Sequence, residues 1–271
     1  MTAPDDMPGP SPAAPAAGPP AAPVLSARDV VIRYGGVTAV NGLSMDAFAA
    51  EAVGLIGPNG AGKSSFLAAL GGQARIQSGS ISLAGQNVSR LPAHARARRG
   101  IARTFQLTSE FSGMTTFENL VTAGHGAAGA SLASVLAHPR RSRQQDLAMA
   151  RRAWEVLERF ELADIANAYG RELSGGQRRL VEIMRCLMRS PTVLLLDEPM
   201  VGVAPHLVDR MVADLKAIRD DGISLIIVEH ALEVVRELCD RVVVMADGAS
   251  IAAGSYEQVV KDREVQAAYL G

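Results

Sequence analysis

A glycine-rich segment constrains this chain more than any other feature of its sequence. Residues 57–64 read Gly-Pro-Asn-Gly-Ala-Gly-Lys-Ser and match the pattern G-x-x-x-x-G-K-[ST]. The segment follows a β-type apolar run at 52–56 and precedes a helical pattern at 65–70, which is the context that the pattern requires. Glycines let the backbone wrap around phosphate groups, so that N–H groups and the helix N-terminus face the negative charge. The sequence therefore predicts a phosphate-binding loop between a strand and a helix.

Two residues at the end of this loop predict nucleotide and metal binding. Lys63 would reach the terminal phosphates, and the hydroxyl of Ser64 would ligate Mg²⁺. The other expected nucleotide contacts come from the loop and the start of the helix: Gly57, Asn59, Gly60, Ala61, Gly62 and Ser65.

A pair of carboxylates predicts the second part of the phosphate site. The apolar run at 193–196 carries Asp197 and Glu198 at its end, where a buried strand would deliver both to the phosphates. Asp197 would hold Mg²⁺ through water, and Glu198 would polarise the attacking water. An acidic pair at a strand end is a weak signal alone, and it gains weight from the glycine-rich loop.

The spacing of apolar residues predicts an α/β fold with a mostly parallel sheet covered by helices. A stretch from about 107 to 176 shows no convincing strand and predicts a helical lobe inserted into the sheet domain. With 271 residues the chain has room for one such composite domain. The β-type runs stand at 30–33, 52–56, 81–84, 192–196, 224–228 and 241–245, several of them separated by helical patterns.

Composition limits the partners that we expect. A formal net charge of −1 gives no reason to expect nucleic acid. The two cysteines, Cys186 and Cys239, lack a companion at metal-ligand spacing and fit a reducing, cytosolic site. Apolar runs fall far below the roughly 18 residues of a membrane-spanning helix, so a membrane role requires a partner protein.

Two further stretches favour solvated chain. Residues 1–23 hold eight of the 14 prolines, mixed with alanine and glycine, and this composition predicts a disordered tail. The basic run of Arg96, Arg98 and Arg99 is more simply interpreted as the solvated face of a helix than as a binding patch.

The pentapeptide Leu173-Ser174-Gly175-Gly176-Gln177 lies between the glycine-rich loop and the carboxylate pair. With it, residues 24–271 resemble the nucleotide-binding domain of the ABC (ATP-binding cassette) superfamily, whose signature this pentapeptide is. The resemblance implies a P-loop NTPase (RecA-like) core, an antiparallel β region near the N-terminus and a helical subdomain at about 107–176. It also implies that the chain binds ATP with Mg²⁺ and hydrolyses it.

The resemblance assigns expected roles to further residues. Tyr34 resembles the aromatic residue on which adenine stacks, and His230 resembles the switch histidine near the γ-phosphate. Gln106 resembles the glutamine that joins the Mg²⁺ and water network to the membrane partner. Residues 202–205 occupy the position of the loop along the dimer seam, although Gly-Val-Ala-Pro departs from the commoner sequence with aspartate.

The signature implies a dimer. In the family, the signature of one subunit covers the ATP held by the other, so two ATPase subunits enclose two nucleotides at their seam. The residues of this chain expected to contact the partner's ATP are Ser174, Gly175, Gly176 and Gln177.

Within the superfamily, four segments are similar to the ATPases of branched-chain amino acid importers: 101–106, 114–120, Val228-Glu229-His230 and the final 268–271. This resemblance implies a second ATPase subunit, identical or related, two membrane permease subunits and, indirectly, a substrate-binding protein. The chain would lie at the cytoplasmic face of the cell membrane, held there by the permeases.

Other functions stay open at this stage. Residues 91–101 and the C-terminal tripeptide also resemble the lipopolysaccharide-export ATPase, and importers of urea or short amides belong to the same broad group. A soluble ABC ATPase of DNA repair or translation usually has two cassettes or a long coiled coil, which this chain lacks. A small-molecule kinase would have no reason to carry the signature. The cargo itself touches other subunits and leaves no trace in this sequence.

Overall fold

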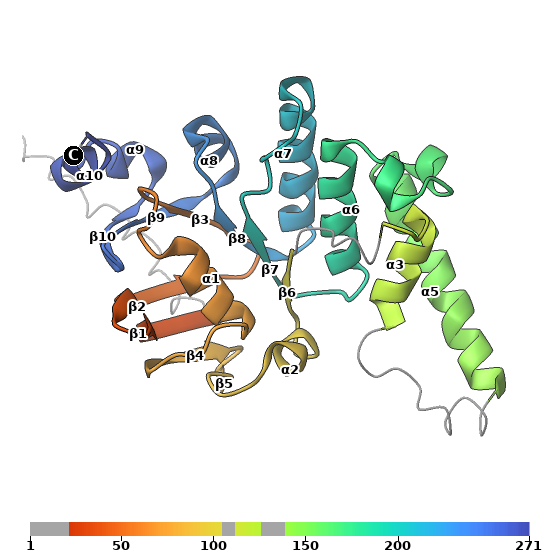
Figure 1. The fold of residues 1–271 in the computed structure, drawn as a ribbon, viewed down its shortest axis with the longest axis horizontal. Helices are drawn as coiled ribbons and strands as arrows, with labels where there is room; N and C mark the ends of the chain where they lie inside the picture. Colours follow the sequence, from red (N-terminus) through yellow and green to blue (C-terminus); the bar gives the residue numbers. More distant parts are fainter. Residues whose placement is uncertain (1–21, 105–111, 126–138, 271) are drawn as a thin grey trace, which may run out of the picture.

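The computed structural model describes residues 22–104, 112–125 and 139–270. Its centre is a six-stranded sheet with the order β10-β9-β3-β8-β7-β6, and a separate four-stranded sheet has the order β2-β1-β4-β5 (Figure 1). The central strands are β3 (Ala52–Ile56), β6 (Ile101–Arg103), β7 (Val193–Asp197), β8 (Ser224–Val228), β9 (Arg241–Ala246) and β10 (Ala249–Gly254). The smaller sheet consists of β1 (Leu25–Tyr34), β2 (Val37–Ala47), β4 (Ser78–Leu83) and β5 (Gln86–Asn87).

The central sheet is parallel except at one edge. Strands β9, β3, β8, β7 and β6 pair in parallel, and β10 pairs with β9 in the antiparallel sense. All pairs of the smaller sheet are antiparallel. The predicted fold class is thereby confirmed, with its mostly parallel core and its antiparallel region near the N-terminus.

Helices cover the central sheet and extend beyond it. Helix α1 (Lys63–Gly71) lies between the two sheets, whereas α6 (Gly175–Leu187), α7 (Pro205–Asp220) and α8 (Leu232–Leu238) lie on the opposite side (Figure 1). Helices α3 (Thr116–His125) and α5 (Pro139–Arg159) form the far end beyond α6. The remaining helical elements are α2 (Ala93–Ala97), η2 (Ala163–Ile165), η3 (Gly170–Glu172), α9 (Tyr256–Val259) and α10 (Arg263–Leu270).

The described part of 107–176 holds helices and one isolated bridge, between Thr115 and Tyr169. The boundaries proposed for a helical subdomain and for an N-terminal tail stay predictions, because residues 1–21, 105–111 and 126–138 lie outside the described residues. Among the described helices, none combines the length and the apolar character needed to cross a membrane.

The core has two layers because successive strand residues point to opposite faces of the sheet. In β7, Leu194 and Leu196 pack in the cluster that includes residues of α6 and α7. Val193 and Leu195 pack in the cluster that includes residues of α1 and the smaller sheet. Burial on both faces explains the continuous apolar run that precedes Asp197.

The interpretation of the basic run at 96–99 is wrong for one residue. Arg98 and Arg99 are exposed, but Arg96 is only 1% exposed. Burial lowers the pKa of its guanidinium to about 10. The group donates hydrogen bonds to four backbone carbonyls, two of them at the C-terminal end of α1, where a cation is favoured by the helix dipole: those of Ala69, Leu70, Ser89 and Leu91.

Candidate functional site

The glycine-rich loop joins the buried strand β3 to helix α1 as the sequence predicts. Gly57 and Gly62 have φ angles of 144° and 96°. A Cβ atom at either position would lie 2.0 Å from a backbone carbonyl oxygen, that of Met245 or of Ala39 respectively. Only glycine fits at these two positions, because side chains are excluded by both the backbone angle and the neighbouring carbonyl.

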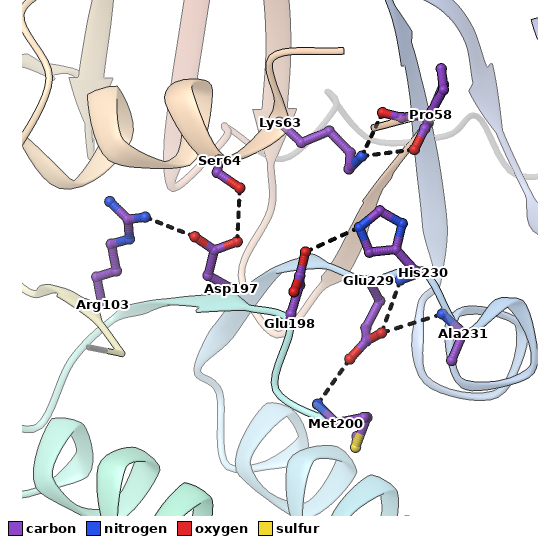
Figure 2. A network of polar contacts seen from close by, with 11 residues as sticks. Pro58, Lys63, Ser64, Arg103, Asp197, Glu198, Met200, Glu229, His230 and Ala231 are labelled. Atoms are coloured by element: carbon purple, nitrogen blue, oxygen red, sulfur yellow. Dashed lines mark hydrogen bonds and ion pairs between the residues drawn. The ribbon is translucent and has the colours of Figure 1, made fainter. Parts of the chain in front are cut away.

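Lys63 begins α1 and is 5% exposed. Its ammonium donates hydrogen bonds to the carbonyl oxygens of Gly57 at 2.7 Å and Pro58 at 2.9 Å (Figure 2). Burial lowers the pKa of this ammonium, and the negative charges of Glu198 and Asp197 oppose the shift. The loop thus holds a positive charge beside the carboxylate pair.

The second predicted element meets the first. The hydroxyl of Ser64 and Oδ1 of Asp197 are 3.2 Å apart, and Oδ2 of Asp197 accepts a hydrogen bond of 2.9 Å from Arg103 (Figure 2). The Arg103 side chain is 13% exposed and stands at the end of β6, paired with Leu195 of β7. Sequence reasoning did not single out Arg103, and its position three residues before Gln106 was the available signal.

Glu198 and His230 also meet. Nε2 of His230 lies 3.0 Å from Oε1 of Glu198, and the side chains are 42% and 38% exposed. Glu198 has a φ angle of 49°, in the left-handed region that non-glycine residues rarely occupy. Its N–H donates to the carbonyl of Val228 at 2.9 Å, which fixes the turn against the neighbouring strand.

One pocket of about 440 Å³ gathers most of the expected nucleotide-binding residues. Its lining includes Asn59, Gly60, Ala61, Gly62, Lys63, Ser64, Ser65, Glu198 and His230. An adjoining pocket of about 350 Å³ is lined by Ser64, Arg103, Thr104, Arg179, Asp197, Glu198 and Val201. Tyr34, which is 52% exposed, lines neither pocket. Gln106 lies outside the described residues.

Arg179 of α6 is another charged pocket residue that sequence reasoning missed. Its guanidinium forms an ion pair of 2.8 Å with Glu182, so it is held in place from its own helix. Arg179 stands two residues after the signature pentapeptide, and this proximity could have identified it as a site residue from the sequence.

The signature residues lie apart from these pockets. Ser174 caps the N-terminus of α6: its hydroxyl accepts the N–H of Gln177 at 3.2 Å, and the Gln177 side chain accepts the N–H of Ser174 at 2.8 Å. A Cβ atom on Gly175 would lie 2.4 Å from the carbonyl oxygen of Gly202, so the signature packs closely against the 202–205 segment. The reciprocal cap organises a helix N-terminus whose residues 174–177 line neither of the two pockets.

The oxygen donors of the site fit a magnesium ion that arrives with phosphate. Among the described residues, no group of three or more His, Cys, Asp or Glu side chains is arranged to hold a metal. The Ser64 hydroxyl and the Asp197 carboxylate provide two oxygen donors close together. Mg²⁺ is commonly bound by one or two protein oxygens, water and substrate phosphates, so this donor set suits it.

Comparison with known proteins gives consistent results. A model of the ABC transporter family matches residues 40–201, more than half of the chain. The chain is 36% identical over 252 residues to the high-affinity branched-chain amino acid transport ATP-binding protein BraF of Pseudomonas aeruginosa, covering 92% of this chain and 98% of BraF. It is 37% identical to LivG of Escherichia coli K12, a protein of the same description, with the same coverage. Identity to the lipopolysaccharide export system ATP-binding protein LptB of Haemophilus influenzae is 34%, covering 92% of this chain and 97% of LptB.

Solved structures agree with the fold. A nucleotide-free ATP-binding cassette from an ABC transporter superposes with a TM-score of 0.83 at 29% identity, covering 92% of this chain and all of that one. An ATP-binding cassette in its ADP conformation gives a TM-score of 0.80 at 30% identity, covering 92% and 99%.

Proposed function

The chain belongs to the ABC transporter family as an ATP-hydrolysing subunit, and from this premise we propose that it powers the import of branched-chain amino acids. One observation supports branched-chain amino acids as the cargo: the similarity to BraF and LivG extends along nearly the whole of all three chains. The chain would lie at the cytoplasmic face of the cell membrane. Two permease subunits would hold it there, and a substrate-binding protein would deliver the cargo to them.

We propose a division of work within the phosphate site. Lys63 binds the terminal phosphates, exchanging its present carbonyl partners for stronger, charge-assisted hydrogen bonds. Ser64 and Asp197 hold Mg²⁺, which when bound neutralises charge on the phosphates. Arg103 orients Asp197 through the carboxylate oxygen that Ser64 does not contact. The distances between these side chains support this assignment.

Glu198 acts as the general base for the attacking water, and His230 orients its carboxylate. The 3.0 Å contact between the two side chains and their partial exposure beside the phosphate loop support these roles. General-base catalysis of this kind contributes about 10²- to 10⁴-fold to a rate. Gln106 would complete the magnesium and water network, and Tyr34 would stack on adenine at the open side of the site.

A second ATPase subunit, identical or related, completes the site. The capped helix N-terminus at Ser174–Gln177 suits an anion, yet it does not line the chain's own nucleotide pocket. The proposal is that it contacts ATP held by the partner subunit.

A transport assay tests the cargo. The chain is co-purified with two permeases, a second ATPase and a binding protein of the proposed importer, and the complex is reconstituted in liposomes. We expect ATP-dependent uptake of radiolabelled leucine and an ATPase rate that rises with leucine-loaded binding protein. ATP-dependent removal of lipopolysaccharide from the membrane, with no leucine uptake, would instead favour the export function that LptB suggests. Stimulation by urea or short amides alone would assign the third cargo class.

A further inference from the structure

Glu229 lies one residue before His230 and is 3% exposed. Its carboxylate accepts hydrogen bonds from three backbone N–H groups. Oε1 accepts from Met200 at 2.9 Å, whereas Oε2 accepts from His230 at 2.9 Å and from Ala231 at 3.3 Å (Figure 2). One buried side chain therefore joins two segments that are 29 residues apart in the sequence.

These two segments carry the proposed catalytic pair. Met200 stands two residues after Glu198, on the chain leaving β7, and His230 stands on the chain leaving β8. The strands are parallel neighbours, with Asp197 paired to Val228, so both segments begin at the carboxyl ends of the strands, on the same side of the sheet. Glu198 and His230 meet on the side of Lys63 and Ser64, whereas the Glu229 carboxylate lies farther from the phosphate loop, beside Met200 and Ala231 (Figure 2).

The hydrogen bond from the Glu198 N–H to the carbonyl of Val228 holds the backbone where β7 ends, but it does not reach Met200 or the two side chains. Both are more than a third exposed, so packing restrains them weakly. The backbone of Glu198 is left-handed, a conformation that persists only where its surroundings hold it. A buried carboxylate is a costly way to stabilise a fold, since an apolar residue of similar volume often serves as well or better. A carboxylate that binds three N–H groups is instead suited to fixing the relative position of two loops.

We propose that Glu229 is a positioning residue for ATP hydrolysis, which holds the segment after Glu198 and the segment of His230 in the register that lets the two side chains meet. The inference rests on the roles proposed above for Glu198 and His230. Glutamine at this position keeps the size of the side chain but replaces one acceptor oxygen with an amide that donates. Glu229→Gln therefore loses either the hydrogen bond from Met200 or those from His230 and Ala231.

The test compares full-length wild type, Glu229→Gln, Glu198→Gln and the control Glu233→Gln, which removes an exposed carboxylate in the first turn of α8. Steady-state ATPase kinetics give kcat and KM, nucleotide titration gives Kd, and thermal unfolding gives Tm. Amide hydrogen exchange, followed by mass spectrometry on peptides spanning 198–204 and 228–232, reports on the three hydrogen bonds directly.

For Glu229→Gln we expect kcat to fall by at least about tenfold, because a small displacement of Glu198 or His230 from its catalytic position slows the reaction strongly. KM and Kd should stay within about twofold, and exchange should accelerate in both peptides. Glu233→Gln should match wild type throughout.

Normal kcat in Glu229→Gln, beside a large loss in Glu198→Gln, would overturn the positioning role alone. A kcat of Glu198→Gln equal to that of wild type would refute the proposed role of Glu198 as the base, and the inference about Glu229 with it. If Glu229→Gln does not fold, Glu229→Asp keeps the charge on a shorter side chain and takes its place. Failure of both variants to unfold cooperatively would assign Glu229 to stability and overturn the proposal.

Discussion

Nε2 of His230 lies 3.0 Å from Oε1 of Glu198, although the two residues are 32 positions apart. The contact forms because β7 and β8 are adjacent and parallel, so the segments after them leave the sheet side by side. It brings an imidazole to a carboxylate that already lies beside the phosphate loop. The pair is the part of the site from which a catalytic effect is most directly expected.

Glu198→Gln should lower kcat by about 10²- to 10⁴-fold while ATP binding survives, because the amide keeps the size of the carboxylate and cannot accept the proton. Uncleaved ATP should then stabilise the dimer by mass action, so the variant should associate with ATP and not with ADP. Phosphate release measured beside light scattering on the co-expressed complex checks both parts. Glu158→Gln, at an exposed position of α5, is the matched control, and near-normal turnover in Glu198→Gln would remove Glu198 from the catalytic role.

Lys63→Ala should weaken MgATP binding by roughly 10- to 150-fold, since hydrogen bonds to charged groups contribute about 1.5–3 kcal/mol. The loss follows from removing the ammonium of Lys63, a residue that is 5% exposed and that the loop places beside the carboxylate pair. Isothermal titration of the variant with MgATP measures the change, with the exposed Lys261→Ala as the control. An unchanged Kd would show that the loop binds phosphate without this side chain.

Ser174→Arg should leave ATP binding at the chain's own loop nearly intact and stop turnover at the partner's nucleotide, where the guanidinium intrudes. Ser174→Ala separates this effect from loss of the helix cap, which costs about 1 kcal/mol of stability. ATPase assays on mixed dimers, each with one Ser174→Arg subunit, locate the defect. A loss confined to the mutated subunit's own nucleotide would contradict the shared site.

Arg96→Ala should lower the free energy of unfolding by on the order of 3 kcal/mol, because it leaves buried carbonyls without a charged donor. Those carbonyls include two at the end of α1, so the phosphate-loop helix loses its C-terminal partner. Urea unfolding measures the change against Arg98→Ala, which removes an exposed guanidinium and should stay within about 0.5 kcal/mol of wild type. Equal stabilities would contradict a structural role for the Arg96 network.

Cys186 and Cys239 should resist alkylation in the folded protein. Burial raises the pKa of each thiol to about 12, so both stay protonated at pH 8, and the thiolate is the reactive form. Iodoacetamide labelling at pH 8, followed by intact mass, should be slow in buffer and fast in denaturant. Rapid labelling in buffer would show that the segments around these residues open readily.

Several elements followed from the sequence because their signals are local. The glycine-rich loop needs backbone angles that glycine alone tolerates, and Gly57 and Gly62 have such angles. The run at 193–196 is apolar throughout because both faces of a central strand are buried. Motif order then predicted the family, which the comparisons confirm.

Other elements were missed because their signal depends on a partner. Strand β2 (Val37–Ala47) carries exposed positions and a break in its alternating pattern at Asn41 and Gly42, and it is fixed by pairing with β1. Strand β6 has three residues, too few for any periodicity, and it is a strand because it pairs with β7.

The sequence by itself determined the phosphate loop, the carboxylate strand and the family, since each is encoded in neighbouring residues whose geometry is set by local backbone chemistry. Only the tertiary structure decided what the charged side chains do. Arg96 is buried under α1, Arg103 reaches Asp197 across 94 positions, and Glu229 binds the N–H of Met200. A charge in the sequence does not say whether it is solvated or paired, because that depends on which distant carbonyls, carboxylates and N–H groups the fold brings within about 3 Å of it.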